Sequence, residues 1–272
     1  MSFSQHWLAL RQHADSSARD ASLAQAVAHW LARHCGSARS LLVDLGCGSG
    51  ANCLHLAPVL PAAAQWLLVD HDAALLAAAQ SRCAGLAVTQ TCQADLATQL
   101  PTLPWSQIAL VSASALLDLV SEAWVEQLVE LVAGQHIPLL CVLSYDGRLQ
   151  LQPADADDPW LRDAVNAHQR RDKGFGPALG PTASTVTAEL LRDQQYWVGT
   201  HGSDWQLDAS DARDAALMLP LIEGWASAAA EQQPAQAHRA QAWANRRTAA
   251  VLRGTLHILV GHQDLLALPP PR

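Results

Sequence analysis

The stretch Val43-Asp44-Leu45-Gly46-Cys47-Gly48-Ser49-Gly50 decides the fold of this chain. It closes the short apolar run 41–45, which predicts a buried strand, and opens residues 50–60, which predict a helix stopped by Pro61. Glycines between the two allow positive φ angles and let a ligand approach the backbone with no Cβ in the way. The stretch therefore predicts a strand, a tight turn and a helix, with a ligand at the turn.

The same alternation of strands and helices extends outward from this stretch. An amphipathic helix is predicted at 21–34, where apolar residues recur at helical spacing. Further strands are predicted at 66–70, 86–92, 108–112 and 137–144, with helices at 72–82 and 121–132. Strands that alternate with helices of this length predict a parallel sheet covered on both faces.

The pattern changes after Ser144. Residues 146–185 are rich in glycine, proline and charge, and we expect an insertion over the sheet there with one helix at 159–171. A sixth strand is predicted at 195–201, two helices within 210–252, and a last strand at 255–261. The sequence thus predicts an α/β fold with a mostly parallel seven-stranded sheet, helices on both faces, and helical insertions in the C-terminal half.

Composition limits the classes of protein to consider. The chain has 272 residues, of which 50% are apolar and 15% charged, and this suits one large domain with a full core. A net charge of −8 disfavours nucleic acid as a partner. No apolar run reaches the roughly 18 residues of a membrane span, and no secretory signal is visible. We expect a cytoplasmic protein with no membrane partner, as a monomer or homodimer.

Cysteine and histidine patterns give no indication of a metal. The six cysteines form no CxxC pair, so buried free thiols are expected rather than disulfides or zinc ligands. The twelve histidines show no HExxH or paired spacing, and no metal is predicted.

Two acids favour one type of cofactor over another at the glycine turn. Gly46, Gly48 and Ala51 also satisfy the fingerprint of dinucleotide enzymes, and Asp70 would bind a ribose in either case. Asp44, however, would repel a pyrophosphate and would attract the amino group of a methionine moiety. Asp95, after the third strand, can accept a hydrogen bond from an adenine amine.

These motifs together carry a family resemblance. The run VDLGCGSG at 43–50, VDHD at 69–72 and QADL at 93–96 resemble class I S-adenosylmethionine-dependent methyltransferases over about residues 35–145. The resemblance implies a Rossmann-like fold, an enzyme, and S-adenosylmethionine as cofactor. The cofactor residues that it implies, with neighbours expected in contact, are Asp44, Gly46, Cys47, Gly48, Gly50, Asp70, His71, Asp95, Leu96 and Ser112.

The resemblance also implies an organisation for the chain and shows one departure. We expect a single methyltransferase domain over 1–272: an N-terminal helical cap at 1–35, a cofactor-binding core at 36–145, a lid or insertion at 146–185, and C-terminal strands with a helical insertion at 186–272. The family usually ends in two adjacent antiparallel strands. Here the helical stretch 210–252 separates the last two predicted strands.

Candidates for the methyl acceptor's site follow the fourth and fifth strands. Ser114 and Asp118 come after the fourth strand, beside the place that the resemblance gives to the methyl group, and Tyr145 ends the fifth. Each can instead satisfy its own backbone, cap a helix or be half-buried packing. The acceptor is expected to be a small molecule methylated on oxygen or nitrogen, by in-line displacement.

Segment 166–181 combines histidine, arginine, lysine and aspartate with glycines and prolines, and it is interpreted as a lid. His168 is the first candidate for a general base, with Tyr145 as a second catalytic candidate. Arg171 and Lys173 can hold a carboxylate or phosphate of the substrate. The alternative for this segment is a solvated helix end and a flexible loop.

Two other classes of function stay open at this point. One is a nicotinamide-dependent oxidoreductase with a Rossmann fold. The other is a non-enzymatic protein that keeps the cofactor fold for binding or regulation.

Overall fold

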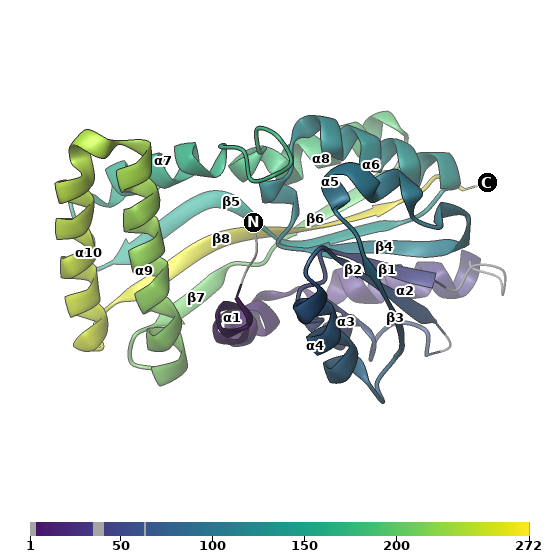
Figure 1. Ribbon diagram of the computed structural model, residues 1–272, viewed down its shortest axis with the longest axis horizontal. Coiled ribbons are helices and arrows are strands. Elements are labelled where there is room, and N and C mark those ends of the chain that lie inside the picture. Colours follow the sequence, from purple (N-terminus) through teal and green to yellow (C-terminus); the bar gives the residue numbers. More distant parts are fainter. Residues whose placement is uncertain (1–3, 35–40, 63, 272) are drawn as a thin grey trace.

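The computed structural model describes residues 4–34, 41–62 and 64–271, and a single eight-stranded sheet runs through the molecule (Figure 1). The strand order is β3-β2-β1-β4-β5-β8-β6, and β7 also pairs with β8. The strands are β1 (Leu41–Leu45), β2 (Gln65–Asp70), β3 (Val88–Gln93), β4 (Ile108–Ser114), β5 (Leu139–Gln152), β6 (Trp197–Gly202), β7 (Trp205–Asp208) and β8 (His257–Leu268).

The first five strands are parallel, whereas β8 runs antiparallel to β5, β6 and β7. The predicted mostly parallel, Rossmann-like α/β fold is confirmed, with eight strands in place of seven. The additional strand is the four-residue β7.

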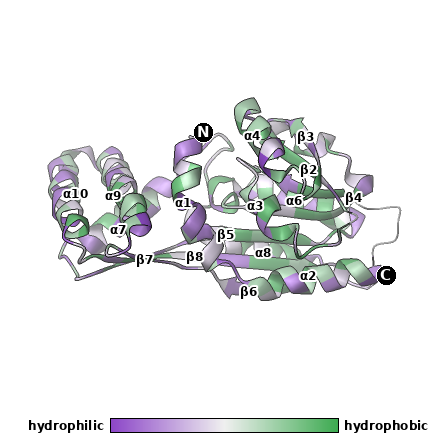
Figure 2. Cartoon of the chain, turned by 90° about the horizontal axis from the view of Figure 1, so that it is seen from below, coloured by the Kyte–Doolittle hydropathy of each residue, from purple (hydrophilic) through white to green (hydrophobic). Residues whose placement is uncertain are grey.

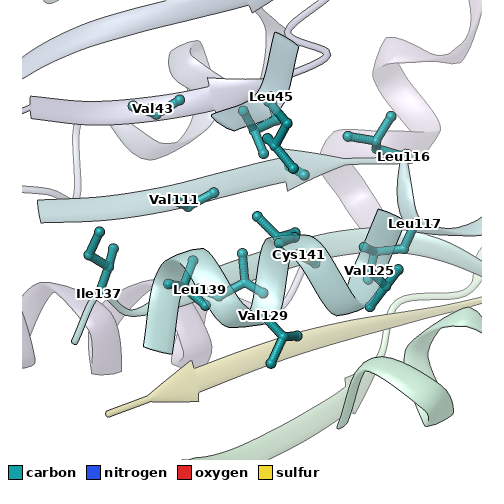
Figure 3. Packing of buried hydrophobic residues seen from close by; sticks show 14 of the residues in the cluster. Val43, Leu45, Val111, Leu116, Leu117, Val125, Val129, Ile137, Leu139 and Cys141 are labelled. Atoms are coloured by element: carbon teal, nitrogen blue, oxygen red, sulfur yellow. The ribbon is translucent and has the colours of Figure 1, made fainter. Parts of the chain in front are cut away.

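Helices cover both faces of the parallel part (Figure 1). One face carries α5 (Leu96–Gln99), α6 (Glu122–Gln135) and α8 (Ala183–Asp193), and the other carries α2 (Ala21–His34), α3 (Ala51–Leu56) and α4 (Ala73–Cys83). All five residues of β1 are buried, which explains why its sequence is an apolar run rather than an alternation. Figure 3 shows the packing on the first face, where Val125 and Val129 of α6 meet Val111, Leu139 and Cys141.

A second packed region lies beyond the parallel part, where β5, β7 and β8 continue under three helices (Figures 1 and 2). These helices are α7 (Asp158–Gln169), α9 (Ala212–Gln232) and α10 (Ala237–Leu252). They share a hydrophobic cluster with the strands, in which Trp243 and Met218 are fully buried. We call this region the distal lobe. The helix α1 (Gln5–Ala18) lies between the distal lobe and the parallel strands, and it contacts β7 and α9.

The expectation that the fifth strand ends at Ser144 and is followed directly by an insertion is wrong. β5 continues to Gln152, and its pairing with β8 shifts register between Tyr145 and Leu149, around Gly147 at φ +88°. The alternation of buried Leu149 and Leu151 with exposed Gln150 and Gln152 is a strand pattern. Asp146, Gly147 and Arg148 come just before this alternation, and a glycine flanked by two charges indicated a loop in the sequence.

The two last predicted strands are neighbours in the sheet, although β8 extends to Leu268, beyond the predicted end at residue 261, and pairs with β6 through residues 263–268. β6 pairs with β8 over six residues, so the helices α9 and α10 separate them in sequence without separating them in the sheet. A long connection can join two paired strands, because the strands must be adjacent in the sheet and not along the chain.

Two remaining expectations concern cysteines and membranes. Cys47, Cys53, Cys83, Cys92 and Cys141 are free thiols, whereas Cys35 lies outside the described residues. No helix within the described ranges combines the length and apolar composition that crossing a membrane requires.

Candidate active site

The glycine turn folds through three left-handed residues. Gly46, Gly48 and Gly50 have φ values of +62°, +51° and +82°, and α3 starts directly after Gly50. The turn is fixed to the neighbouring strand by two hydrogen bonds: the Cys47 N–H donates to the carbonyl of Val69 at 3.0 Å, and the Gly48 N–H donates to the Asp70 carboxylate at 2.9 Å. The turn therefore forms a rigid edge at the carboxyl ends of β1 and β2.

A cavity of about 490 Å³ opens above this edge. Of the residues singled out from the sequence, those that line it are Gly46, Cys47, Gly48, Asp70, His71, Asp95, Leu96, Ser114 and Lys173. Those that do not line it are Asp44, Gly50, Ser112, Asp118, Tyr145, His168 and Arg171. The predicted cofactor residues from β1, β2 and the segment after β3 are thus brought to one wall.

Asp70 and Asp95 hold their carboxylates at this wall through backbone hydrogen bonds. The Asp72 N–H donates to Asp70 at 3.0 Å, and the His71 ring lies 3.3 Å from the same oxygen. Asp95 caps α5 by accepting from the Ala97 N–H at 3.0 Å. The capping role and the cavity position are therefore compatible, because the cap fixes the rotamer that faces the cavity.

Asp44 lies one layer behind the cavity, and its side chain is fully buried. One of its oxygens accepts from Asn52 at 2.5 Å and from Ser112 at 3.0 Å, while the other has no partner among the described residues. Burial raises the pKa of this carboxyl to about 6. An orphaned buried carboxylate oxygen beside a cavity is a place for a donor such as an ammonium group.

A partly buried arginine that we did not single out from the sequence lies next to this acid. The Arg19 guanidinium donates to Asn52 at 2.7 Å and to Ser114 at 2.9 Å, and both of these residues line the cavity. Burial lowers its pKa. Arg19 belongs to the predicted N-terminal helical cap, in which a single arginine carries no distinguishing signal.

The helix α1 forms a further wall through Leu8, Arg11 and Asp15. Arg11 makes two hydrogen bonds to Asp15, at 2.9 and 3.0 Å, and its guanidinium stacks 5.0 Å above the ring centre of Trp205. Trp205 is buried beneath Arg11 and does not line the cavity, which leaves it unavailable for stacking on a substrate there.

The loop after α7 contributes Lys173, Gly174 and Phe175 to the cavity wall. Asp172 organises this loop by accepting the N–H groups of Gly174 and Gly176 at 2.7 and 3.0 Å. Phe175 packs edge-to-face on Trp124 of α6, with the ring centres 5.7 Å apart. Part of the predicted lid thus lies at the cavity.

The remaining candidates for the acceptor site do not line the cavity. Asp118 is buried, burial raises the pKa of its carboxyl to about 6, and the Tyr145 N–H donates to it. The Tyr145 hydroxyl donates to Asn166 at 2.8 Å. His168 contacts Glu231 at 3.1 Å, and the exposed Arg171 lies 3.8 Å from the same carboxylate. Tyr145, His168 and Arg171 remain predictions, since they lie outside the cavity wall.

Comparison with known proteins identifies the central part of the chain. Residues 42–134 match a family described as a methyltransferase domain. A comparison with curated protein sequences found no match. The match confirms the family resemblance that the glycine-rich stretch and its acids carry.

Solved structures resemble the chain weakly over most of its length. They include the YcgJ protein of Bacillus subtilis, at 12% identity, a TM-score of 0.49, and coverage of 90% of this chain and 98% of that one. The cyclopropane synthase MmaA2 of Mycobacterium tuberculosis has 11% identity, a TM-score of 0.45, and coverage of 89% and 82%. Geranyl diphosphate C-methyltransferase of Streptomyces coelicolor A3(2) has 13% identity, a TM-score of 0.41, and coverage of 90% and 76%. At these values the similarity does not identify a substrate.

Proposed function

We propose that this chain, whose residues 42–134 form a methyltransferase domain, transfers a methyl group from S-adenosylmethionine to an oxygen or nitrogen of a small-molecule acceptor. The family match confirms the enzyme class and its cofactor, and it disfavours the nicotinamide oxidoreductase and the non-enzymatic protein. The acceptor and the atom methylated are part of the proposal.

The cavity wall supports a specific placement of the cofactor. Asp70 would hold the ribose hydroxyls, Asp95 and Leu96 the adenine, and the glycine turn would lie along the cofactor with no Cβ in the way. Asp44, with Asn52 and Ser112, would place negative charge near the amino group of the methionine moiety. The orphaned oxygen of Asp44 fits this assignment, because a buried acceptor without a donor is costly.

The cofactor supplies an electrophilic methyl group when bound. The residues of this chain then have to align the acceptor with it and exclude water. Leu116, Leu119 and Phe175 are apolar residues of the cavity wall, and Ser114 and Lys173 are the polar groups proposed to contact the acceptor. Segment 146–185 would act as the lid, in a single domain that spans the chain.

The free thiols of the described residues fit the reducing cytoplasm that we propose as the protein's location. The proposal includes no nucleic-acid or membrane partner and a monomer or homodimer. The observation that carries the proposed function is the convergence of Gly46, Gly48, Asp70 and Asp95 on one cavity wall, because these residues come from three separate segments of the matched domain.

Isothermal titration with S-adenosylhomocysteine tests this proposal, with NADH titrated in parallel. We expect saturable binding of S-adenosylhomocysteine and none of NADH. Binding of NADH instead would contradict the cofactor assignment, and binding of neither would contradict the proposed enzyme as it stands.

The substitution Asp70→Ala tests the position of the ribose. It removes a charge-assisted contact and should weaken S-adenosylhomocysteine binding by about 1.5–3 kcal/mol. Asp163→Ala is the matched control, because Asp163 is an exposed aspartate outside the cavity whose loss should leave the affinity unchanged. Thermal unfolding of both variants checks that the glycine turn survives loss of the Gly48 hydrogen bond to Asp70. Equal affinity of both variants would mean that the ribose lies elsewhere.

A further inference from the structure

The chain contains a single lysine. Sixteen of its 17 lysine and arginine residues are arginine, and the exception is Lys173. The chain uses arginine for its extensive ion pairs, including Arg11 with Asp15, Arg148 with Asp146, and Arg247 with Asp158. A single lysine among sixteen arginines suggests that position 173 needs a property that arginine lacks.

The position of Lys173 is as unusual as its identity. It is 8% exposed, and it lines the same cavity as the glycine turn. Within the described residues its Nζ makes no ion pair with a carboxylate, and its hydrogen-bond partner is Nδ1 of His168, at 3.4 Å. A buried ammonium without a carboxylate partner pays a desolvation cost that loss of its proton removes.

His168 connects Lys173 to the surface. Its Nε2 lies 3.1 Å from the Glu231 carboxylate, which belongs to α9 of the distal lobe. With Nε2–H donating to that carboxylate, Nδ1 presents its lone pair to Lys173. The Glu231 side chain is 60% exposed, so the row Lys173–His168–Glu231 runs from the cavity to solvent.

We propose that Lys173 is the general base that takes the proton of the methyl acceptor, and that His168 and Glu231 pass this proton to solvent. The proposal deepens the proposed function and rests on it. Arginine is the usual choice for holding a carboxylate or phosphate, and the chain has sixteen; a buried lysine differs in that it can be deprotonated near neutral pH. His168, our first candidate for the base, thereby becomes a relay residue.

The step balances in atoms and electrons. A lone pair of the acceptor oxygen or nitrogen forms the new bond to the methyl carbon, and the carbon–sulfur bond breaks with its electron pair on sulfur. The acceptor's proton moves to the neutral amine of Lys173. That proton then moves to Nδ1 of His168, and the resulting imidazolium, paired with Glu231, releases a proton to solvent.

The groups that face Lys173 act in opposite directions on its pKa. Burial lowers the pKa, and Arg171, two residues away, lowers it further. Glu231 of α9 and Asp118 in the short helical turn after β4 raise it. Arg11 lines the same cavity but is paired with Asp15, and Nδ1 of His168 lies 3.4 Å from the lysine Nζ.

The single lysine makes a direct test available. Protein grown on lysine labelled with ¹³C at Cε gives one side-chain resonance, that of Lys173, which is titrated by pH in the free protein and with S-adenosylhomocysteine. The expected midpoint lies below that of an N-acetyl-lysine amide in the same buffer. A midpoint equal to or above the reference in both states would overturn the proposal and make Lys173 a permanent ammonium.

Two glutamate variants test the relay. Glu231→Gln removes a charge that raises the pKa of Lys173 and should move the midpoint further down. Glu130→Gln is the matched control, an exposed glutamate on α6 whose loss should leave the midpoint in place. An unchanged midpoint in Glu231→Gln would overturn the relay through His168.

Calorimetry separates this proposal from the proposed function. Lys173→Met should keep its affinity for S-adenosylhomocysteine within about threefold, or about 0.7 kcal/mol, because a base for the acceptor is not a cofactor contact. A loss as large as that of Asp70→Ala would make Lys173 a cofactor ligand and overturn its role as base. Absence of binding to the unmodified protein would instead count against the proposed function, while the lysine titration of the free protein would still decide the state of Lys173.

Discussion

Single residues show where burial and charge oppose one another in this protein. Asp44 is the fourth of the five residues of β1, a strand buried on both faces, where an acid is rare without a partner. Its two donors, Asn52 and Ser112, satisfy one oxygen and leave the other without a partner among the described residues. An acid so placed costs stability in the ligand-free protein, and this cost is consistent with a site that a ligand completes.

The pH dependence of stability should reveal Asp44. Its pKa is raised in the folded state from 3.8 to about 6, so the folded state binds the extra proton between these values and stability falls as the pH rises through them. Asp44→Asn removes this titration, while Asp118, whose pKa is also raised to about 6, stays in both proteins.

The variant should therefore gain stability relative to the parent by about 1–3 kcal/mol on going from pH 4 to pH 7. Urea unfolding without ligand at several pH values measures this difference. A difference that does not change with pH would show that Asp44 titrates normally in the folded state.

Among the elements, the turn between β1 and α3 is built on backbone conformation. Gly50 has φ +82°, and a Cβ there would lie 3.1 Å from Cα and Cβ of Ala79 and from Sγ of Cys83. Close packing of α3 on α4 thus needs glycine at this position for space as well as for conformation.

Gly85 provides a matched control for this turn. Its φ of +81° is nearly the same, but a Cβ there would meet nothing within 4 Å. Gly85→Ala should cost about 1 kcal/mol from backbone strain alone, and Gly50→Ala about 2–4 kcal/mol, because overpacking adds to that strain. Denaturant unfolding compares the two directly. Equal losses would mean that the α3–α4 contact relaxes without cost.

At the scale of the whole molecule, β5 and β8 join two packed regions into one sheet. Their pairing continues from Leu139 with Ala267 to Gln152 with His257, so each strand contributes to the parallel part and to the distal lobe. Lys173, in the loop that follows α7 of the distal lobe, lines the cavity, and α1 contacts β7 and supplies residues to the cavity wall. The distal lobe is thus connected to the cavity through both segments.

A buried ion pair anchors the distal lobe. The Arg247 side chain is 4% exposed and pairs with Asp158, which also accepts from the indole of Trp243 at 2.8 Å. Arg247→Met should cost about 3–5 kcal/mol, because it leaves the Asp158 charge without its main partner. Arg213→Met is the control, since Arg213 pairs with Asp211 at the surface and its loss should leave the stability nearly unchanged. Comparable losses would show that the buried pair is no stronger than an exposed one.

Circular dichroism and tryptophan fluorescence report on both regions during the same unfolding experiment. Because β5 and β8 run through both regions, we expect the two signals to change together in the parent protein. Separate transitions would show that the distal lobe unfolds independently of the parallel part.

The sequence by itself determined the parallel part of the fold and one wall of the cavity. The strand at 41–45 and the helix at 21–34 are found at their predicted bounds, and Gly46, Gly48, Asp70 and Asp95 line the cavity. Such features follow from local causes: apolar periodicity, glycine at positive φ, and acids at strand ends, each legible within a few residues.

The tertiary structure alone decided the rest, because it depends on contacts between distant segments. Arg19 donates hydrogen bonds to Asn52, 33 residues away, and to Ser114, 95 residues away. The helix α1 forms part of the cavity wall, and nothing in its own sequence predicts that position. Lys173 and His168 lie five residues apart, and the sequence ranked the histidine first as a base. Their order from cavity to solvent is set by α9, which places Glu231 beside His168 from 63 residues away, and no local pattern encodes that placement.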